Sequence, residues 1–139
     1  MAQAPLDAKQ VGWFAARQPG VIGFLEERLL RSAGDVFAVA LEASWQLCAR
    51  FTEEHGVPAK RIGRSLLERA QAAIEVEMMG TTMWGDTCAE RQPELCEWVA
   101  AFCQDPPTLV TAAERRKLLA VLLSVVYALD EQATGRPVP

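Results

Sequence analysis

The sequence predicts an all-α protein, a single-domain bundle of about five helices with two central apolar helices. Three observations predict this class. Apolar residues recur at three- and four-residue spacings over long segments, runs of alternating apolar and polar residues are missing, and proline, glycine or capping residues separate the segments. The 139 residues are the size of one domain, and 50% of them are hydrophobic, so the chain has enough apolar material for a core.

Two helices are predicted in the N-terminal half. The first opens at Pro19, because proline is favoured in the first turn of a helix, and it ends at Gly34. The second opens at Asp35, a good N-cap residue, and ends at Gly56. Apolar residues cover most of its circumference, which is typical of a central helix with neighbours on several sides.

Three more helices are predicted towards the C-terminus. The third begins near Pro58 and has a single apolar stripe, so we expect it to be half-exposed. The fourth begins at Pro93. The fifth opens with Thr111 and Glu114, whose spacing is that of a capping box. Residues 118–129 in this last helix are apolar on most faces, which predicts either a second central helix or the centre of a dimer interface.

The helical domain is expected to span residues 11–132. Residues 1–10 and 133–139 are predicted to be a flexible N-terminal segment and a flexible C-terminal tail. The first residues lack the basic stretch and apolar run of a signal peptide, and the longest apolar run, 118–129, is shorter than the roughly 20 residues that cross a bilayer. We therefore expect a cytoplasmic protein that does not enter a membrane.

The residue content argues against most catalytic and cofactor sites. His55 is the only histidine, whereas zinc and iron sites draw on several histidines or on clustered cysteines. The chain has no nucleophile elbow around a serine and no glycine-rich phosphate loop. The paired carboxylates Glu94 and Glu97 are expected to be solvated. We therefore predict a protein without catalytic activity, metal or cofactor.

The cysteines are interpreted as buried free thiols. They are Cys48, Cys88, Cys96 and Cys103, and no C-x-x-C occurs. In a reducing compartment such residues fill space as small apolar side chains. Cys96 and Cys103 are seven positions apart, so they share one face of the fourth predicted helix.

Residues 50–69 have the outline of a helix-turn-helix. A helix, a Gly-Val turn and a second helix that opens with basic residues follow one another, and Lys60, Arg61 and Arg64 would then contact DNA. Against this, the net charge is −4, and Thr52 stands where a small residue usually allows close helix packing. An acidic chain is a poor neutraliser of phosphates, so an ordinary connection between two helices is favoured over DNA binding.

The connection between the third and fourth helices, MMGTTMWGDTC at residues 78–88, is unusually apolar for a loop. Methionine suits adaptable contact surfaces, and tryptophan is frequent at interface hot spots. Two interpretations stay open: a docking surface for a partner, or a buried crossover that closes one end of the bundle. The residues predicted to bind a partner are Met78, Met79, Met83, Trp84 and Trp98.

These features favour a small protein–protein interaction domain, an adaptor or regulator that forms a homodimer or binds another protein. A domain of 139 residues has limited means to cover two apolar helices, and a dimer interface would cover them. Two alternatives remain. One is a DNA-binding transcriptional regulator that uses residues 50–69, and the other is a small-ligand-binding bundle. Its pocket would be lined by Trp45, Met83, Trp84 or Trp98.

Overall fold

The computed structural model describes residues 7–29, 35–56, 60–79, 86–106 and 111–139. Every regular element within these ranges is an α-helix, so the predicted all-α class is confirmed. The described residues form seven helices, where the sequence predicted about five. In chain order they are α1 (Ala8–Arg17), α2 (Pro19–Leu29), α3 (Val36–His55), α4 (Arg64–Met78), α5 (Asp86–Arg91), α6 (Pro93–Gln104) and α7 (Ala112–Thr134).

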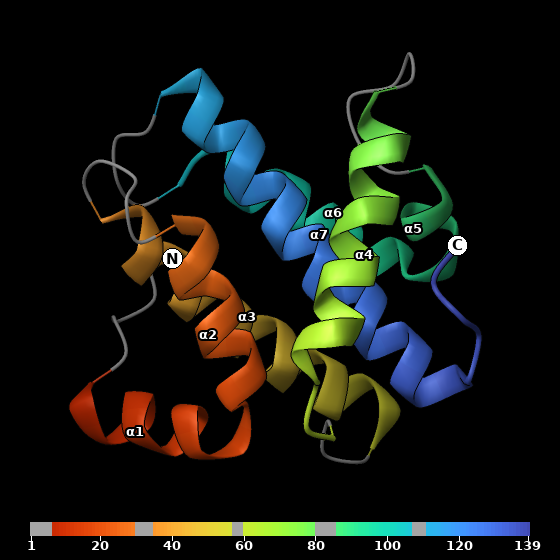
Figure 1. The fold of residues 1–139 in the computed structure, drawn as a ribbon. Helices are drawn as coiled ribbons and strands as arrows, with labels where there is room; N and C mark the ends of the chain where they lie inside the picture. Colours follow the sequence, from red (N-terminus) through yellow and green to blue (C-terminus); the bar gives the residue numbers. More distant parts are fainter. Residues whose placement is uncertain (1–6, 30–34, 57–59, 80–85, 107–110) are drawn as a thin grey trace.

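Helix α7 passes through the middle of the molecule, and α4 crosses it (Figure 1). It also packs on α3 and α6. From Leu118 to Asp130 every residue except the half-buried Leu119 is buried, so α7 has neighbours on nearly all sides. The predicted capping box begins this helix: the Thr111 hydroxyl accepts a hydrogen bond from the Glu114 amide, and the Glu114 carboxylate accepts one from the Thr111 amide.

Helix α3 is the second strongly apolar helix, and it packs on α2, α6 and α7. Its buried residues lie on several faces: Val36, Val39, Ala40, Leu41, Ala43, Ser44, Leu47, Cys48 and Phe51. Both apolar helices are therefore shielded from water within a single chain. A second copy is not needed to cover them, so this reason for expecting a homodimer does not apply to the fold.

Helix α1 lies where the sequence predicted no helix, and it begins inside the segment 1–10 that was expected to be flexible. Its start is fixed by Asp7 and Gln10, which form a capping box. The Asp7 carboxylate accepts from the Gln10 amide at 2.7 Å, and the Gln10 side chain accepts from the Asp7 amide at 3.1 Å. Phe14 is the one buried residue of α1, which packs beside α2 at the edge of the molecule (Figure 1).

Helix α4 begins at Arg64, six residues later than the start near Pro58 that the sequence predicted. The side chain of Gln18 accounts for the difference. Its Nε2 donates to the Lys60 carbonyl at 2.8 Å, and its Oε1 accepts from the Ile62 amide at 2.9 Å. Backbone groups held in this way by a distant side chain cannot join the ladder of a helix, so the segment before α4 is not helical.

The C-terminal residues 133–139, which were expected to form a flexible tail, are bound to the rest of the molecule at several points. The carbonyl oxygen of Pro137 accepts a hydrogen bond from the Arg91 guanidinium of α5 at 2.9 Å. The Val138 amide donates to the Glu131 carboxylate at 2.8 Å. The end of the chain is therefore held against α5 and the last turns of α7.

Candidate functional site

A cleft of about 400 Å³ opens between α1 and α3. Two edge-to-face ring contacts build its wall: Trp13 and Trp45 have centroids 4.9 Å apart, and Phe14 and Trp45 have centroids 5.5 Å apart. Such perpendicular arrangements suit the charge distribution of aromatic rings. The residues that line the cleft are Trp13, Phe14, Arg17, Gln18, Trp45, Cys48, Ala49 and Thr52. The volume is within the range of small-molecule sites.

Arg17 places a positive charge at the rim of the cleft. Its guanidinium lies 4.2 Å from the centroid of the Trp13 ring, which is cation–π contact. In the part of the chain that the structure describes, no carboxylate forms an ion pair with Arg17. The neighbouring Gln18, by contrast, has both ends of its amide bonded to backbone groups. The cleft thus combines an aromatic wall with one cation that is available to a ligand.

Of the two described tryptophans that the sequence offered as pocket residues, Trp45 lines this cleft and Trp98 does not. Trp45 belongs to its wall and lies on α3. Trp98 lies on α6, where it stacks on Phe102 at 5.2 Å. Trp13 is a further lining residue, and it lies on α1, a helix that the sequence did not predict. The signal for it was present in the adjacent tryptophan and phenylalanine of VGWFAAR, followed by an arginine one helical turn later.

The residues predicted to bind a partner are spread over the molecule. Met78 is buried, whereas its neighbour Met79, just after α4, is 82% exposed. Trp98 is half-buried and lies on a different helix. Met83 and Trp84 lie outside the described residues. The described members of this set therefore do not form one surface.

Lys60, Arg61 and Arg64 do not have the arrangement of a helix-turn-helix. Residues 56–63 separate α3 from α4, which is longer than the usual turn of three or four residues. Lys60 and Arg61 precede α4 instead of opening it. Arg64 begins the helix, but its guanidinium forms an ion pair with Glu27 of α2. These basic side chains are therefore not presented together on the first turn of a second helix.

A second group of reactive side chains lies in the interior, where α4, α5 and α7 meet. The Glu77 carboxylate accepts hydrogen bonds from the backbone amides of Thr87 at 3.0 Å and Cys88 at 3.4 Å, and from the Tyr127 hydroxyl. Burial raises the pKa of Tyr127, and the adjacent Glu77 carboxylate raises it further. Tyr127 therefore stays protonated and acts as a donor, so that one carboxylate joins three helices.

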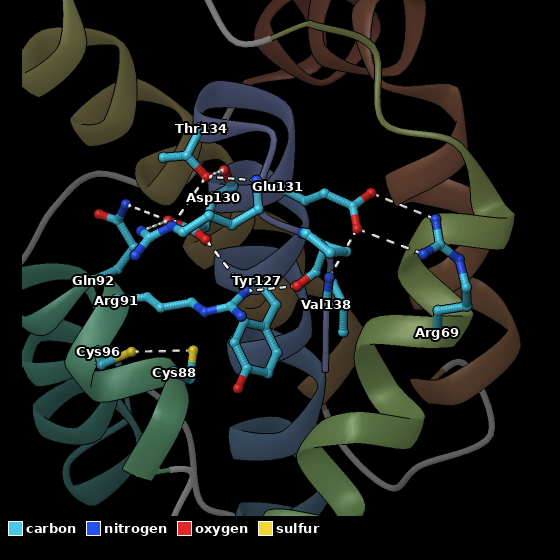
Figure 2. A network of polar contacts seen from close by, with 12 residues as sticks. Arg69, Cys88, Arg91, Gln92, Cys96, Tyr127, Asp130, Glu131, Thr134 and Val138 are labelled. Atoms are coloured by element: carbon cyan, nitrogen blue, oxygen red, sulfur yellow. Dashed lines mark hydrogen bonds and ion pairs between the residues drawn. The ribbon is translucent and has the colours of Figure 1, made fainter.

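Asp130 is a fully buried carboxylate beside this group (Figure 2). Its Oδ1 accepts hydrogen bonds from Gln92 at 3.0 Å and Arg136 at 2.7 Å. Its Oδ2 lies 3.6 Å from the Arg91 guanidinium, which also lies 5.5 Å from the centroid of the Tyr127 ring. A buried charge without partners would be strongly destabilising, and two arginines here compensate it. Side chains of the same chain bind both oxygens of this carboxylate, which is typical of a structural ion-pair network.

Cys88 of α5 and Cys96 of α6 lie side by side below this network (Figure 2). Their sulfur atoms are 3.3 Å apart, and the Cys88 thiol also donates to the Leu123 carbonyl at 3.8 Å. All four cysteines are free and buried, which confirms the sequence interpretation. The pairing was not predicted, because the helical segment breaks at Gln92 between the two cysteines and their spacing therefore corresponds to no single helix face.

Among the residues that the structure describes, no group of three or more His, Cys, Asp or Glu side chains is placed to hold a metal ion. No helix in the described ranges has both the length and the apolar character needed to cross a membrane. No known family model, curated protein or solved structure matches the chain. Its function therefore has to be inferred from its own geometry.

Proposed function

We propose that the chain is a non-catalytic binding domain whose α1–α3 cleft binds a small, planar, apolar molecule with an anionic group. One observation carries the proposal: three aromatic rings and an arginine without an ion-pair partner among the described residues meet at an opening of about 400 Å³. This function corresponds to the ligand-binding alternative that the sequence left open, with Trp45 as a lining residue.

The aromatic rings of the cleft would bind the planar part of such a ligand, and the Arg17 guanidinium would bind its anionic group. A ring packed edge-to-face or offset against Trp13 or Trp45 gains about 0.5–1.5 kcal/mol beyond the burial of its apolar area. An anion beside Arg17 gains at most about 1 kcal/mol, because the guanidinium is exposed to solvent. The apolar area buried on the rings adds to their contribution, so the rings supply most of the affinity, and the arginine distinguishes an anionic ligand from a neutral one by roughly fivefold.

A pair of fluorescent probes tests both parts. 8-Anilinonaphthalene-1-sulfonate is a planar aromatic anion, and N-phenyl-1-naphthylamine is its neutral counterpart without the sulfonate. We expect Trp45→Ala to weaken both probes about tenfold, which corresponds to a loss of about 1.4 kcal/mol. We expect Arg17→Gln to weaken the sulfonate about fivefold and to leave the neutral probe unchanged, since only the charge interaction is removed.

Trp98→Ala is the matched control, because it removes the same side chain from α6, outside the cleft. It should leave both dissociation constants unchanged, and circular dichroism should verify that each variant is folded. If Trp45→Ala and Trp98→Ala have equal effects, the probes do not bind in the cleft. If Arg17→Gln weakens both probes alike, charge recognition by Arg17 is wrong.

Self-association through α4 is a second candidate function, and it corresponds to the homodimer that the sequence favoured. Ala72, Val76 and Met79 are exposed at spacings of four and three residues, so they form an apolar stripe along one face of the helix and its end. Val76 is 70% exposed and Met79 is 82% exposed. A two-fold axis along such a stripe would bury it against its own copy.

Light scattering across a range of protein concentrations tests this candidate. We expect the unmodified chain to dimerise at high concentration and the double variant Val76→Glu, Met79→Glu to stay monomeric, because each glutamate would be desolvated at the interface. Ala101→Glu, at an exposed position on α6, is the control and should dimerise normally. An unmodified chain that is monomeric at every concentration contradicts self-association.

A further inference from the structure

The thiols of Cys88 and Cys96 form a pair that belongs neither to the α1–α3 cleft nor to the exposed stripe on α4. Their sulfur atoms are 3.3 Å apart, both side chains are fully buried, and they belong to two consecutive helices that pack on each other. A disulfide has a sulfur–sulfur distance of about 2.05 Å, so the two atoms need to approach by little more than 1 Å. Neither Cys48 nor Cys103 has a thiol partner among the described residues.

The surroundings of Cys88 keep its thiol protonated while it is buried. The Cys96 thiol donates to the Cys88 sulfur, and the Cys88 thiol donates to the Leu123 carbonyl. The hydrogen bond with Cys96, burial, and the charges of Glu77 and Asp130 together raise the pKa of Cys88. Because the thiolate is the reacting species, the pair is slow to react until one of the thiols reaches solvent.

Local opening of α5 gives such access. This helix has six residues, shorter than the length at which helices are stable alone, so its position depends on its contacts with α4, α6 and α7. Glu77 holds its first turn through two backbone amides and is itself held by the Tyr127 hydroxyl. When those hydrogen bonds break, α5 can move away from the core, and Cys88 becomes accessible to small molecules in solution.

We propose that Cys88 and Cys96 form a reversible intramolecular disulfide that joins α5 to α6, with a low-molecular-weight disulfide as the oxidant. The thiolate of the first cysteine exposed attacks the small disulfide, forms a mixed disulfide and releases one small thiol. The second cysteine then displaces the other small thiol. In total, two protein S–H bonds break and one protein S–S bond forms. Two electrons pass to the small disulfide, and the two protons end on the small thiols released.

Equilibration of the full chain with mixtures of reduced and oxidised glutathione tests the proposal. After acid quenching and alkylation, mass spectrometry counts the free thiols and peptide mapping locates any crosslink. We expect the two thiols of the pair to be lost together, slowly, with a crosslink between residues 88 and 96, and to return when dithiothreitol is added. Hydrogen exchange at the amides of α5 should slow in the oxidised form, because the crosslink restricts opening of this helix.

The variant Cys48→Ala with Cys103→Ala retains the pair and should show the same two-thiol transition. Cys96→Ala should abolish the crosslink and stop at a mixed disulfide with glutathione on Cys88. The proposal is overturned if the unmodified chain accumulates glutathione on one cysteine without the crosslink, if the crosslink joins other cysteines, or if all four thiols stay reduced under the most oxidising mixture. These outcomes are read on the unmodified chain, so they do not depend on whether a variant folds.

Discussion

Gly20→Ala should destabilise the fold, and the structure indicates by how much. A Cβ atom at Gly20 would overlap the Ile62 carbonyl oxygen well inside 3.0 Å, a separation below which real Cβ atoms essentially never come. The Ile62 carbon and the Arg64 nitrogen lie only 3.4 Å and 3.5 Å from the same point. The obstacle is backbone that Gln18 holds by two hydrogen bonds, so it cannot turn aside as the tip of a flexible side chain would.

Overpacking of this kind costs about 1–3 kcal/mol. Replacement of a helical glycine by alanine stabilises the helix by at most about 1 kcal/mol, and by less in the first turn of a helix, where Gly20 lies. We therefore expect Gly20→Ala to lower the free energy of unfolding by roughly 1–2 kcal/mol, mainly because the new methyl group pushes α2 away from the backbone just before α4.

Gly12→Ala is the matched variant. Gly12 lies within α1, is exposed, and has nothing within 4 Å of the position of a Cβ atom. This substitution should raise the free energy of unfolding by about 0.5–1 kcal/mol through helix propensity alone. Urea unfolding of both variants, followed by circular dichroism, measures the two changes. If Gly20→Ala is as stable as the unmodified chain, the close approach of α2 to the segment before α4 is wrong.

Two further changes test the interior. Tyr127→Phe removes the hydroxyl that donates to Glu77 and keeps the ring. It should lower the free energy of unfolding by about 1.5–3 kcal/mol and lower the midpoint of thermal unfolding. An unchanged midpoint would show that this hydrogen bond does not stabilise the fold. Burial raises the pKa of Cys48 from 9.0 to about 12. Between these two pH values the unfolded chain releases a proton that the folded chain keeps. The free energy of unfolding therefore falls as pH rises, by up to about 1.4 kcal/mol per pH unit. Cys48→Ala should therefore flatten the decline in urea-unfolding free energy between pH 9 and pH 11 under reducing conditions, and an equally steep decline would contradict the burial of that thiol.

The features predicted correctly from the sequence are those that depend on neighbouring residues. The capping box of Thr111 and Glu114, and the glycine after α3, act within one turn of a helix. Gly56 and Gly135 have positive φ values of 73° and 75°, which glycine adopts without the steric cost of a side chain. The capping box of Asp7 and Gln10 is equally local, and it is the sequence signal that marks the start of α1.

Other features depend on contacts between distant parts of the chain, and no local pattern predicts them. The start of α4 is set by Gln18, which is more than 40 positions away from the backbone groups it binds. The approach of Cys88 to Cys96 depends on the angle between α5 and α6. The cleft needs Trp13 and Trp45 to meet across two helices, which only the packing of α1 brings about.

Helix α1 contributes one buried residue, Phe14, which is fewer than any other helix of ten residues or more contributes. One side of the cleft belongs to α3, whose amides should exchange with solvent only when the whole domain unfolds. The opposite wall belongs to α1, whose amides should exchange by fraying of one short segment. A ligand packed against both Trp13 and Trp45 would link α1 to α3, so its binding should slow hydrogen exchange at residues 8–17 and leave exchange in the rest of the molecule unchanged.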